Sequence, residues 1–140
     1  MKNKLIMVLV VLLLAGVVAI SGCTSSDSSA NNTPFEVGNF TVSQGSYGMW
    51  DVDGSITPTE DISYIEIVTI WYDSSGAVIE RDPLAWNIND AKAGQTLKIH
   101  SSTSLYQKGT PTKVDILFFD SALSGGDDSD AIYTLTINIT

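Results

Sequence analysis

The stretch that decides the fold is Tyr64–Tyr72, YIEIVTIWY, together with the turn sequence DSSG at residues 73–76. Successive side chains of an extended strand point to opposite sides. One side of this run carries Ile65, Ile67 and Trp71, and the other carries Tyr64, Val68, Ile70 and Tyr72. Because both sides are apolar, we expect a central strand whose second face is covered by loops or neighbouring aromatic residues, the alternative being that this face meets another protein. The DSSG sequence predicts a tight hairpin turn, since Asp opens turns and Gly accepts a left-handed backbone.

Similar runs occur on both sides of this strand. They are rich in β-branched and aromatic residues, and clusters of Gly, Asp, Ser and Pro separate them, which is typical of an all-β sandwich or barrel. In one of them Leu97 and Ile99 alternate with Lys98 and His100, which predicts one buried and one exposed face. We expect about seven strands, at residues 35–42, 47–56, 64–72, 77–81, 96–101, 113–119 and 132–139.

The stretch from residue 62 to His100 resembles the FxLYD-type domain found in prokaryotes. The matching residues are Ile65, Ile67, Trp71, Tyr72, Asp73, Gly76, Val78, Gly94 and Leu97. The preceding strand departs from the family pattern, because the Asn that usually follows it is replaced by Ile56-Thr57-Pro58 after Gly54. The resemblance implies an immunoglobulin-like antiparallel β-sandwich, usually outside the cell and on a lipoprotein. It implies no catalytic residue.

The N-terminal segment has the layout of a secretory signal. Two Lys residues precede an apolar run, Leu5–Ile20, and small residues follow it. The sequence Ile20-Ser21-Gly22-Cys23 resembles the lipobox of prokaryotic lipoproteins, which implies cleavage before Cys23 and lipid on its sulfur. We therefore expect a lipid anchor in the bilayer and a domain at the outer face of the cell membrane. The alternative is an uncleaved anchor helix over residues 5–22, with the same topology.

The residues that follow predict a tether. Residues 24–34, TSSDSSANNTP, contain no large apolar side chain and cannot bury enough surface to order themselves. A flexible chain of this length has a mean reach of about 17–20 Å. The predicted organisation is a signal peptide at 1–22, a lipidated Cys and tether at 23–34, and an extracytoplasmic domain at 35–140.

Composition excludes several classes of function. The 140 residues include 7 Lys and Arg against 16 Asp and Glu, for a net charge of −9. This charge argues against electrostatic binding of nucleic acid and against a polybasic membrane patch. A single Cys and a single His exclude a disulfide framework, an intramolecular Cys/His zinc site and a blue-copper site. We expect no cofactor.

Two sets of residues are candidates for catalysis. His100 is the only histidine that a nucleophilic triad could use, but no G-x-S-x-G sequence accompanies it. Asp51 and Asp53 share one face of a predicted strand, as a carboxylate pair would, although no surrounding motif supports glycosidase chemistry. We expect both sets to be solvated surface residues, so the chain is predicted not to be an enzyme.

Three further groups are candidates for binding or modification. Asp127, Asp128 and Asp130 form a loop cluster that could take calcium, although the EF-hand spacing is absent. Trp86 follows Pro83-Leu84-Ala85 in a loop-like segment, where its ring could stack on a sugar, the alternative being a packing residue. Glycosylation sequons begin at Asn31, Asn39 and Asn138.

These observations favour a non-catalytic module that works by surface interaction or structural support. Its partner would be an envelope protein or a glycan. The alternative is an accessory protein of an envelope or transport complex that binds calcium or a glycan.

Overall fold

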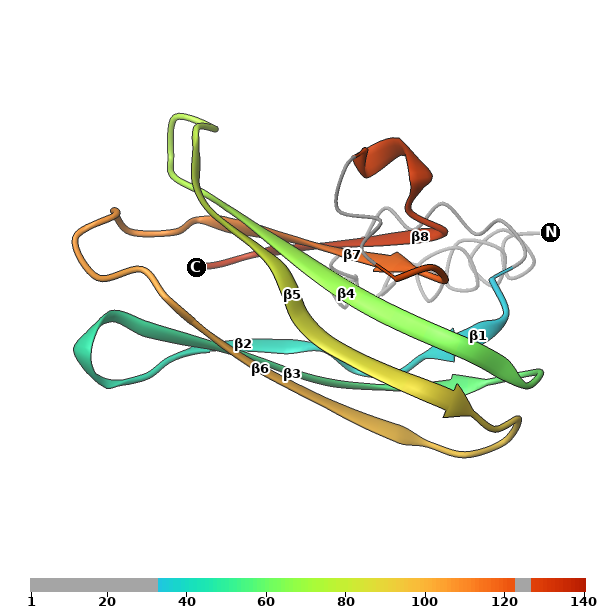
Figure 1. The fold of residues 1–140 in the computed structure, drawn as a ribbon. Helices are drawn as coiled ribbons and strands as arrows, with labels where there is room; N and C mark the ends of the chain where they lie inside the picture. Colours follow the sequence, from blue (N-terminus) through green and yellow to red (C-terminus); the bar gives the residue numbers. More distant parts are fainter. Residues whose placement is uncertain (1–32, 123–126) are drawn as a thin grey trace, which may run out of the picture.

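The computed structural model describes residues 33–122 and 127–140, which form two antiparallel sheets packed face to face (Figure 1). In sheet A, β3 (Met49–Pro58) pairs on one side with β6 (Leu97–Ser104). On its other side it pairs with two short strands, β1 (Phe35–Val37) and β2 (Thr41–Gln44). Sheet B has the order β5 (Val78–Ala91), β4 (Ile62–Tyr72), β7 (Lys113–Phe119) and β8 (Tyr133–Asn138). Single-turn 3-10 helices are η1 (Ser46–Gly48) and η2 (Asp128–Asp130).

The connections place the strands in an immunoglobulin-like sandwich. The chain passes between the sheets from β3 to β4, from β5 to β6 and from β6 to β7. The pairs β3–β6 and β4–β7 correspond to the B–E and C–F pairs of that fold, with β8 in the place of strand G. The predicted fold class is confirmed, with eight strands in the described residues. The lipobox, Cys23, most of the tether and Asn31 lie outside these residues.

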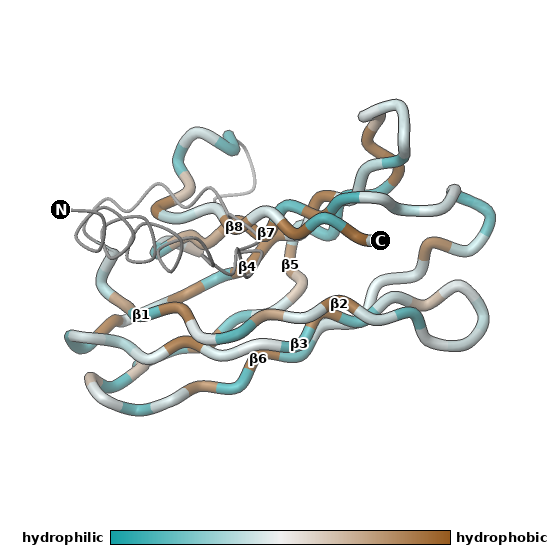
Figure 2. Tube along the Cα trace, turned by 180° about the vertical axis from the view of Figure 1, so that it is seen from behind, coloured by the Kyte–Doolittle hydropathy of each residue, from teal (hydrophilic) through white to brown (hydrophobic). Residues whose placement is uncertain are grey.

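The main core lies between the two sheets, and Figure 2 shows apolar residues along both facing strand sets. Alternation supplies it: Val52 and Ile56 from β3 and Leu97 and Ile99 from β6 point inward, while Lys98 and His100 remain exposed. Across the gap, the rings of Trp50 and Trp71 approach to 6.2 Å between centroids. The core residues are Phe35, Trp50, Val52, Ile56, Ile62, Ile65, Ile67, Trp71, Ala91, Leu97, Ile99, Leu105, Val114, Ile116, Phe118 and Leu135.

A second cluster lies on the outer face of sheet B, as the two-sided pattern of β4 predicted. Val68 and Ile70 pack there with Leu117 and Phe119 from β7, and Tyr72 and Ala131 lie against them. All four central side chains are buried. Burial, followed by a hydrogen bond to Asp115, raises the pKa of Tyr72 to about 12.

The predicted hairpin turn after β4 is confirmed. The Asp73 carbonyl accepts from the Gly76 amide at 3.0 Å, and the Asp73 carboxylate accepts from the amides of Ser75 and Ala77. Gly76 has φ +82°, the left-handed conformation that the sequence required there.

The predicted strand at residues 35–42 is wrong in one respect, because it is two strands. The chain leaves β3 after Val37, where the Gly38 amide still donates to the Ser55 carbonyl at 2.8 Å, and it pairs again from Thr41. Between the two, the ring of Phe40 lies over Gly54, where any Cβ would overlap the ring. Gly54 therefore lets Phe40 pack edge-on against Phe118, 6.0 Å between centroids.

Two other predicted boundaries need correction. The strand predicted at 47–56 begins only at Met49, because η1 precedes it and Tyr47 has φ +56°. The strand predicted at 77–81 continues to Ala91 through Pro83. Pro83 is tolerated because β5 is an edge strand, and the register between β4 and β5 shifts where Pro83 lies. The segment around Trp86 is therefore strand and not loop.

Candidate functional site

The outer face of sheet A brings the predicted catalytic candidates together. Asp51 and Asp53 point to this face from β3, and His100 lies directly opposite Asp53 on β6. The Nδ1 atom of His100 is 2.8 Å from an Oδ1 atom of Asp53. The prediction that the two carboxylates share a strand face is confirmed, as is the prediction that His100 is an exposed strand residue.

The electrostatics of this pair are those of a solvated contact. The hydrogen bond to Asp53, reinforced by the charge of Asp53, raises the pKa of His100 above 6.5. The side chains of His100 and Asp53 are 66% and 55% exposed. The hollow beside them is open and is bordered by Asn39, Thr41 and Lys98. Because water reaches the pair, the arrangement can bind and release a proton but does not shield a reacting group.

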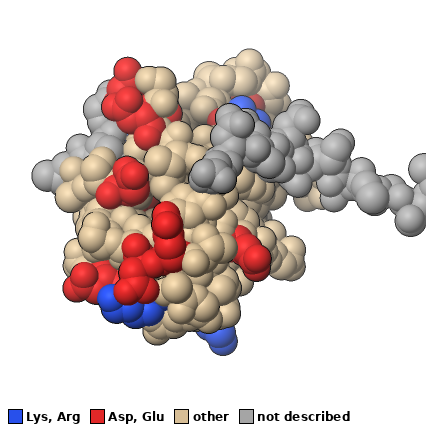
Figure 3. Space-filling view, turned by 90° about the vertical axis from the view of Figure 1, so that its right-hand side faces the viewer, with Lys and Arg blue, Asp and Glu red and all other residues tan. Residues whose placement is uncertain are grey.

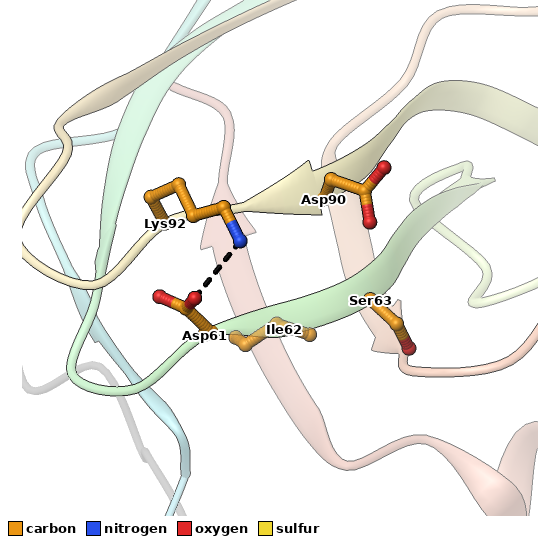
Figure 4. A pocket seen from close by; sticks show the side chains of 5 residues that line it. All are labelled: Asp61, Ile62, Ser63, Asp90 and Lys92. Atoms are coloured by element: carbon orange, nitrogen blue, oxygen red, sulfur yellow. Dashed lines mark hydrogen bonds and ion pairs between the residues drawn. The ribbon is translucent and has the colours of Figure 1, made fainter.

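A second hollow lies at the end of the sandwich where the chain enters (Figure 4). The turns before β4 and after β5 meet there, and the Lys92 Nζ atom donates to Asp61 at 2.9 Å. This bond lowers the pKa of Asp61 and raises that of Lys92. Asp90 borders the same hollow and has a left-handed φ of +54°. The positive charge in this hollow is therefore that of Lys92, which lies beside the carboxylates of Asp61 and Asp90. The Lys92–Asp61 bond joins the turn before β4 to the turn after β5.

This end of the molecule is strongly acidic. Figure 3 shows several separate clusters of Asp and Glu on it and fewer Lys or Arg side chains. We call it the entry end, because the chain enters the sandwich here at Pro34. The Pro34 carbonyl accepts from the Thr59 amide, which follows β3. The β5–β6 turn belongs to it as well, since the Gly94 amide donates to the Pro58 carbonyl at 2.8 Å.

The structure gives other roles to two of the three predicted calcium ligands, and the third, Asp130, is exposed in η2. The Asp127 carboxylate accepts from the Ser129 amide at 2.9 Å and caps η2. Hydrogen bonds from the Ser129 side chain, and then from its amide, lower the pKa of Asp127. Asp128 forms an ion pair of 2.8 Å with Arg81 of β5. Among residues 33–122 and 127–140, no three His, Cys, Asp or Glu side chains form a group that could hold a metal ion.

Trp86, the candidate for stacking on a sugar, is a packing residue in the structure. It lies in β5 opposite Ile67, is half-buried and packs against the main core. Its position opposite an inward-facing residue turns its ring toward the other sheet. This outcome is the packing alternative named above.

The two sequons that the structure describes differ in setting. Asn39 is exposed in the connection between β1 and β2, and Thr41 of the same sequon is exposed as well. Asn138 is exposed at the end of β8, paired with Lys113. Both asparagines are accessible, and their glycosylation remains a prediction.

Sequence reasoning missed two tyrosines at the end of the sandwich opposite the entry end. Tyr47 precedes β3 and is 91% exposed, and Tyr106 follows β6 and is 63% exposed. We call this the far end; Figure 1 shows the β2–β3, β4–β5 and β6–β7 turns gathered there. The sequence pattern places Tyr47 within a strand, and no sequence signal marks its exposure.

The comparisons with known proteins give no family. No family model matches the chain. No curated protein matches it either. Among solved structures, β-glucosidase 3B from Thermotoga neapolitana, in complex with α-D-glucose, aligns with 74% of this chain at 8% identity and a TM-score of 0.37. This chain covers 15% of the glucosidase.

A second similar structure is chicken MD-1 complexed with lipid IVa. It aligns with 83% of this chain and 99% of its own, at 10% identity and a TM-score of 0.36. Both likenesses concern β-rich architecture alone. In the part of the chain that the structure describes, no helix is long and apolar enough to cross a membrane.

Proposed function

We propose that this chain is a lipid-anchored, extracytoplasmic β-sandwich that works by surface contact and not by catalytic turnover. The observation that carries the proposal is the order along the chain. A lipobox-like sequence ending at Cys23 is followed by a polar tether and then by a folded sandwich that begins at Phe35. This order is what a displayed module needs, because the anchor, spacer and domain follow one another.

The charge distribution supports the same arrangement. The tether joins the sandwich at the acidic entry end, which would face the membrane. Acidic side chains repel an anionic bilayer, so the domain would be held off the surface that anchors it. The far end with Tyr47 and Tyr106 would then point away from the membrane.

The geometry around His100 supports a role without turnover. A general base is more effective where burial and neighbours tune its pKa toward its task. The His100–Asp53 pair lies on an open strand face and is more than half exposed. Turnover of a glycan or peptide probe by the full-length protein, lost in His100→Ala, would contradict this part of the proposal.

The experiment that tests the anchor is mass spectrometry of the full-length protein isolated from membranes of its host. We expect a chain that starts at Cys23, carries lipid on this residue and lacks residues 1–22. Cys23→Ala should accumulate as the uncleaved precursor, whereas Ser25→Ala in the tether should mature normally.

Two outcomes would revise the proposal. A wild-type chain that retains residues 1–22 and an unmodified Cys23 would support the uncleaved anchor helix. Protease treatment of intact cells tests the side of the membrane, since an exposed domain should be cut within the tether. Full protection from protease, with cutting after lysis, would overturn the extracytoplasmic location.

A further inference from the structure

The far end of the sandwich carries an aromatic surface that no part of the fold explains. Of the four exposed large hydrophobic side chains in the described residues, three lie at this end: Tyr47, Tyr106 and Val78. The fourth, Leu84, lies in the irregular part of β5. A tyrosine ring that is 91% exposed, as that of Tyr47 is, contributes almost nothing to packing.

The two tyrosines are held on turns that are fastened to each other. The Leu105 amide donates to the Gly48 carbonyl at 2.8 Å. Gly48, with φ +74°, lies so close to the backbone of Tyr106 that an added Cβ would come within 2.9 Å of its Cα. The β2–β3 turn is further closed by the Gly45 amide, which donates to the Met49 carbonyl at 2.9 Å. The backbones of Tyr47 and Tyr106 therefore keep a fixed relation, and binding would not have to order them.

The backbone of Tyr47 is strained. Its φ of +56° lies in the left-handed region, where glycine or asparagine would be cheaper and a bulky residue is uncommon. Strain of this kind is characteristic of positions where the side chain is needed for something other than stability. The combination of exposure and backbone strain at Tyr47 suggests a role for its ring outside the fold.

The charged side chains near the two tyrosines indicate what kind of ligand this end could bind. In the turns that carry the two tyrosines, residues 43–48 and 104–112, the one charged side chain is Lys108, and it is paired with Glu80. The β4–β5 turn at the same end adds Asp73, whose carboxylate accepts from the amides of Ser75 and Ala77. The remaining polar groups are hydroxyls and amides, such as those of Ser46 and Gln107. The entry end of the same chain carries several carboxylate clusters (Figure 3). The two turns that carry the tyrosine rings hold no unpaired charge, which fits an uncharged ligand that offers both apolar faces and hydroxyl groups.

We infer that Tyr47 and Tyr106 form a binding site for neutral carbohydrate. The flat C–H faces of pyranose rings stack on tyrosine rings, and sugar hydroxyls exchange hydrogen bonds with the phenol, hydroxyl and amide groups around them. The inference deepens the proposed function, on which it rests for the direction in which the site points. It replaces Trp86, which is packed into the sandwich, as the stacking residue.

The test is calorimetric titration of the full-length protein in a detergent without a sugar head group. The probes are neutral hexasaccharides of glucose, mannose and N-acetylglucosamine, with hexagalacturonate as a charged comparison. We expect at least one neutral probe to bind and hexagalacturonate not to bind. Tyr47→Gly and Tyr106→Ser should each weaken that binding by about tenfold or more, the loss of one stacking contact. Leu84→Ser, which removes an exposed apolar residue elsewhere, should leave it unchanged.

Tyr47→Gly also guards against a trivial loss through unfolding. Glycine relieves the left-handed strain, so this variant should be at least as stable as the wild type while it binds less well. The inference is overturned if no neutral probe binds at millimolar concentration, if only hexagalacturonate binds, or if the two tyrosine variants bind as the wild type does. A photo-crosslink from position 47 to a protein, without glycan binding, would likewise overturn it. Lipid on Cys23 is measured separately, so failure here leaves the anchor proposal standing.

Discussion

The outer faces of the two sheets differ in what covers them. On sheet B, Val68 and Phe119 are 0% and 1% exposed, although they point away from the main core. On sheet A, the equivalent outward positions hold Asp53 and His100, which water reaches. The sandwich therefore has apolar residues on three of its four sheet faces. The strand sequence already signals this difference, because β4 is apolar on both sides and β6 alternates.

The difference shows where substitutions should matter. Residues on the outer face of sheet B act as core residues, and Tyr72 and Ala131 cover part of them. Residues on the outer face of sheet A act as surface residues. Substitutions on the two faces should therefore differ in cost by several kcal/mol.

The largest effect is expected from Phe119→Ala. Removing a fully buried aromatic ring leaves a cavity and should lower the free energy of unfolding by about 3–5 kcal/mol. Urea denaturation of the full-length protein measures it. The matched control is Ser102→Ala on the outer face of sheet A, which should change stability by no more than about 0.5 kcal/mol. Equal effects of the two substitutions would show that the outer cluster is not a packed core.

The two sides of β3 give the next comparison. Gly54→Ala places a methyl group against the ring of Phe40 and should cost about 1–3 kcal/mol through overpacking. Asp53→Ala, one residue away and on the outer face, should cost far less. The same denaturation experiment distinguishes them. If Gly54→Ala leaves stability unchanged, Phe40 can leave its contact with Phe118 without penalty.

A smaller effect is expected where the η2 segment is tied to sheet B. Asp128→Asn removes the ion pair with Arg81, whose side chain is 29% exposed, and should cost up to about 1 kcal/mol. Hydrogen exchange of the Ile132 amide, which donates to the Phe118 carbonyl, should become faster. Asp61→Asn breaks the more exposed pair with Lys92 and should cost less. If Asp61→Asn costs more than Asp128→Asn, the Asp61–Lys92 pair stabilises the fold more than the Asp128–Arg81 pair does.

The smallest effect concerns the pH dependence of the sheet A face. Because Asp53 raises the pKa of His100 above 6.5 in the folded state, charged His100 stabilises the fold at pH values below about 6.5. This contribution is lost as pH rises through the raised pKa. An NMR titration of the His100 ring should show the pKa returning toward 6.5 in Asp53→Asn, with a smaller change in Asp51→Asn. An unchanged pKa in Asp53→Asn would contradict the contact.

Much of the fold was predictable because the buried faces repeat every second residue. The alternation of Leu97 and Ile99 with Lys98 and His100 predicted which face of β6 is buried, and the DSSG sequence predicted its turn. The break at Gly38–Phe40 was not predictable, because it depends on how Phe40 meets Gly54 of another strand. The continuation of β5 through Pro83 was missed for a similar reason, since only the sheet order shows that β5 is an edge where proline is tolerated.

The candidate site was predictable in part. The shared face of Asp51 and Asp53 follows from their spacing, and the exposure of His100 follows from strand alternation. Their meeting depends on the register between β3 and β6, which pairs Asp53 with His100 from 47 residues away. The prediction that Trp86 lies in a loop-like segment was wrong, because pairing with β4 holds this segment extended.

The sequence by itself determined the all-β class, the two-sided central strand and the turns, because side-chain alternation and turn chemistry are local properties of the chain. Only the tertiary structure decided which residues from distant strands meet. It paired Asp53 with His100, covered the outer cluster of sheet B with the segment of Ala131, and fastened the turns of Tyr47 and Tyr106 at one end. These contacts depend on strand register and on the packing of one sheet on the other, which no local pattern encodes.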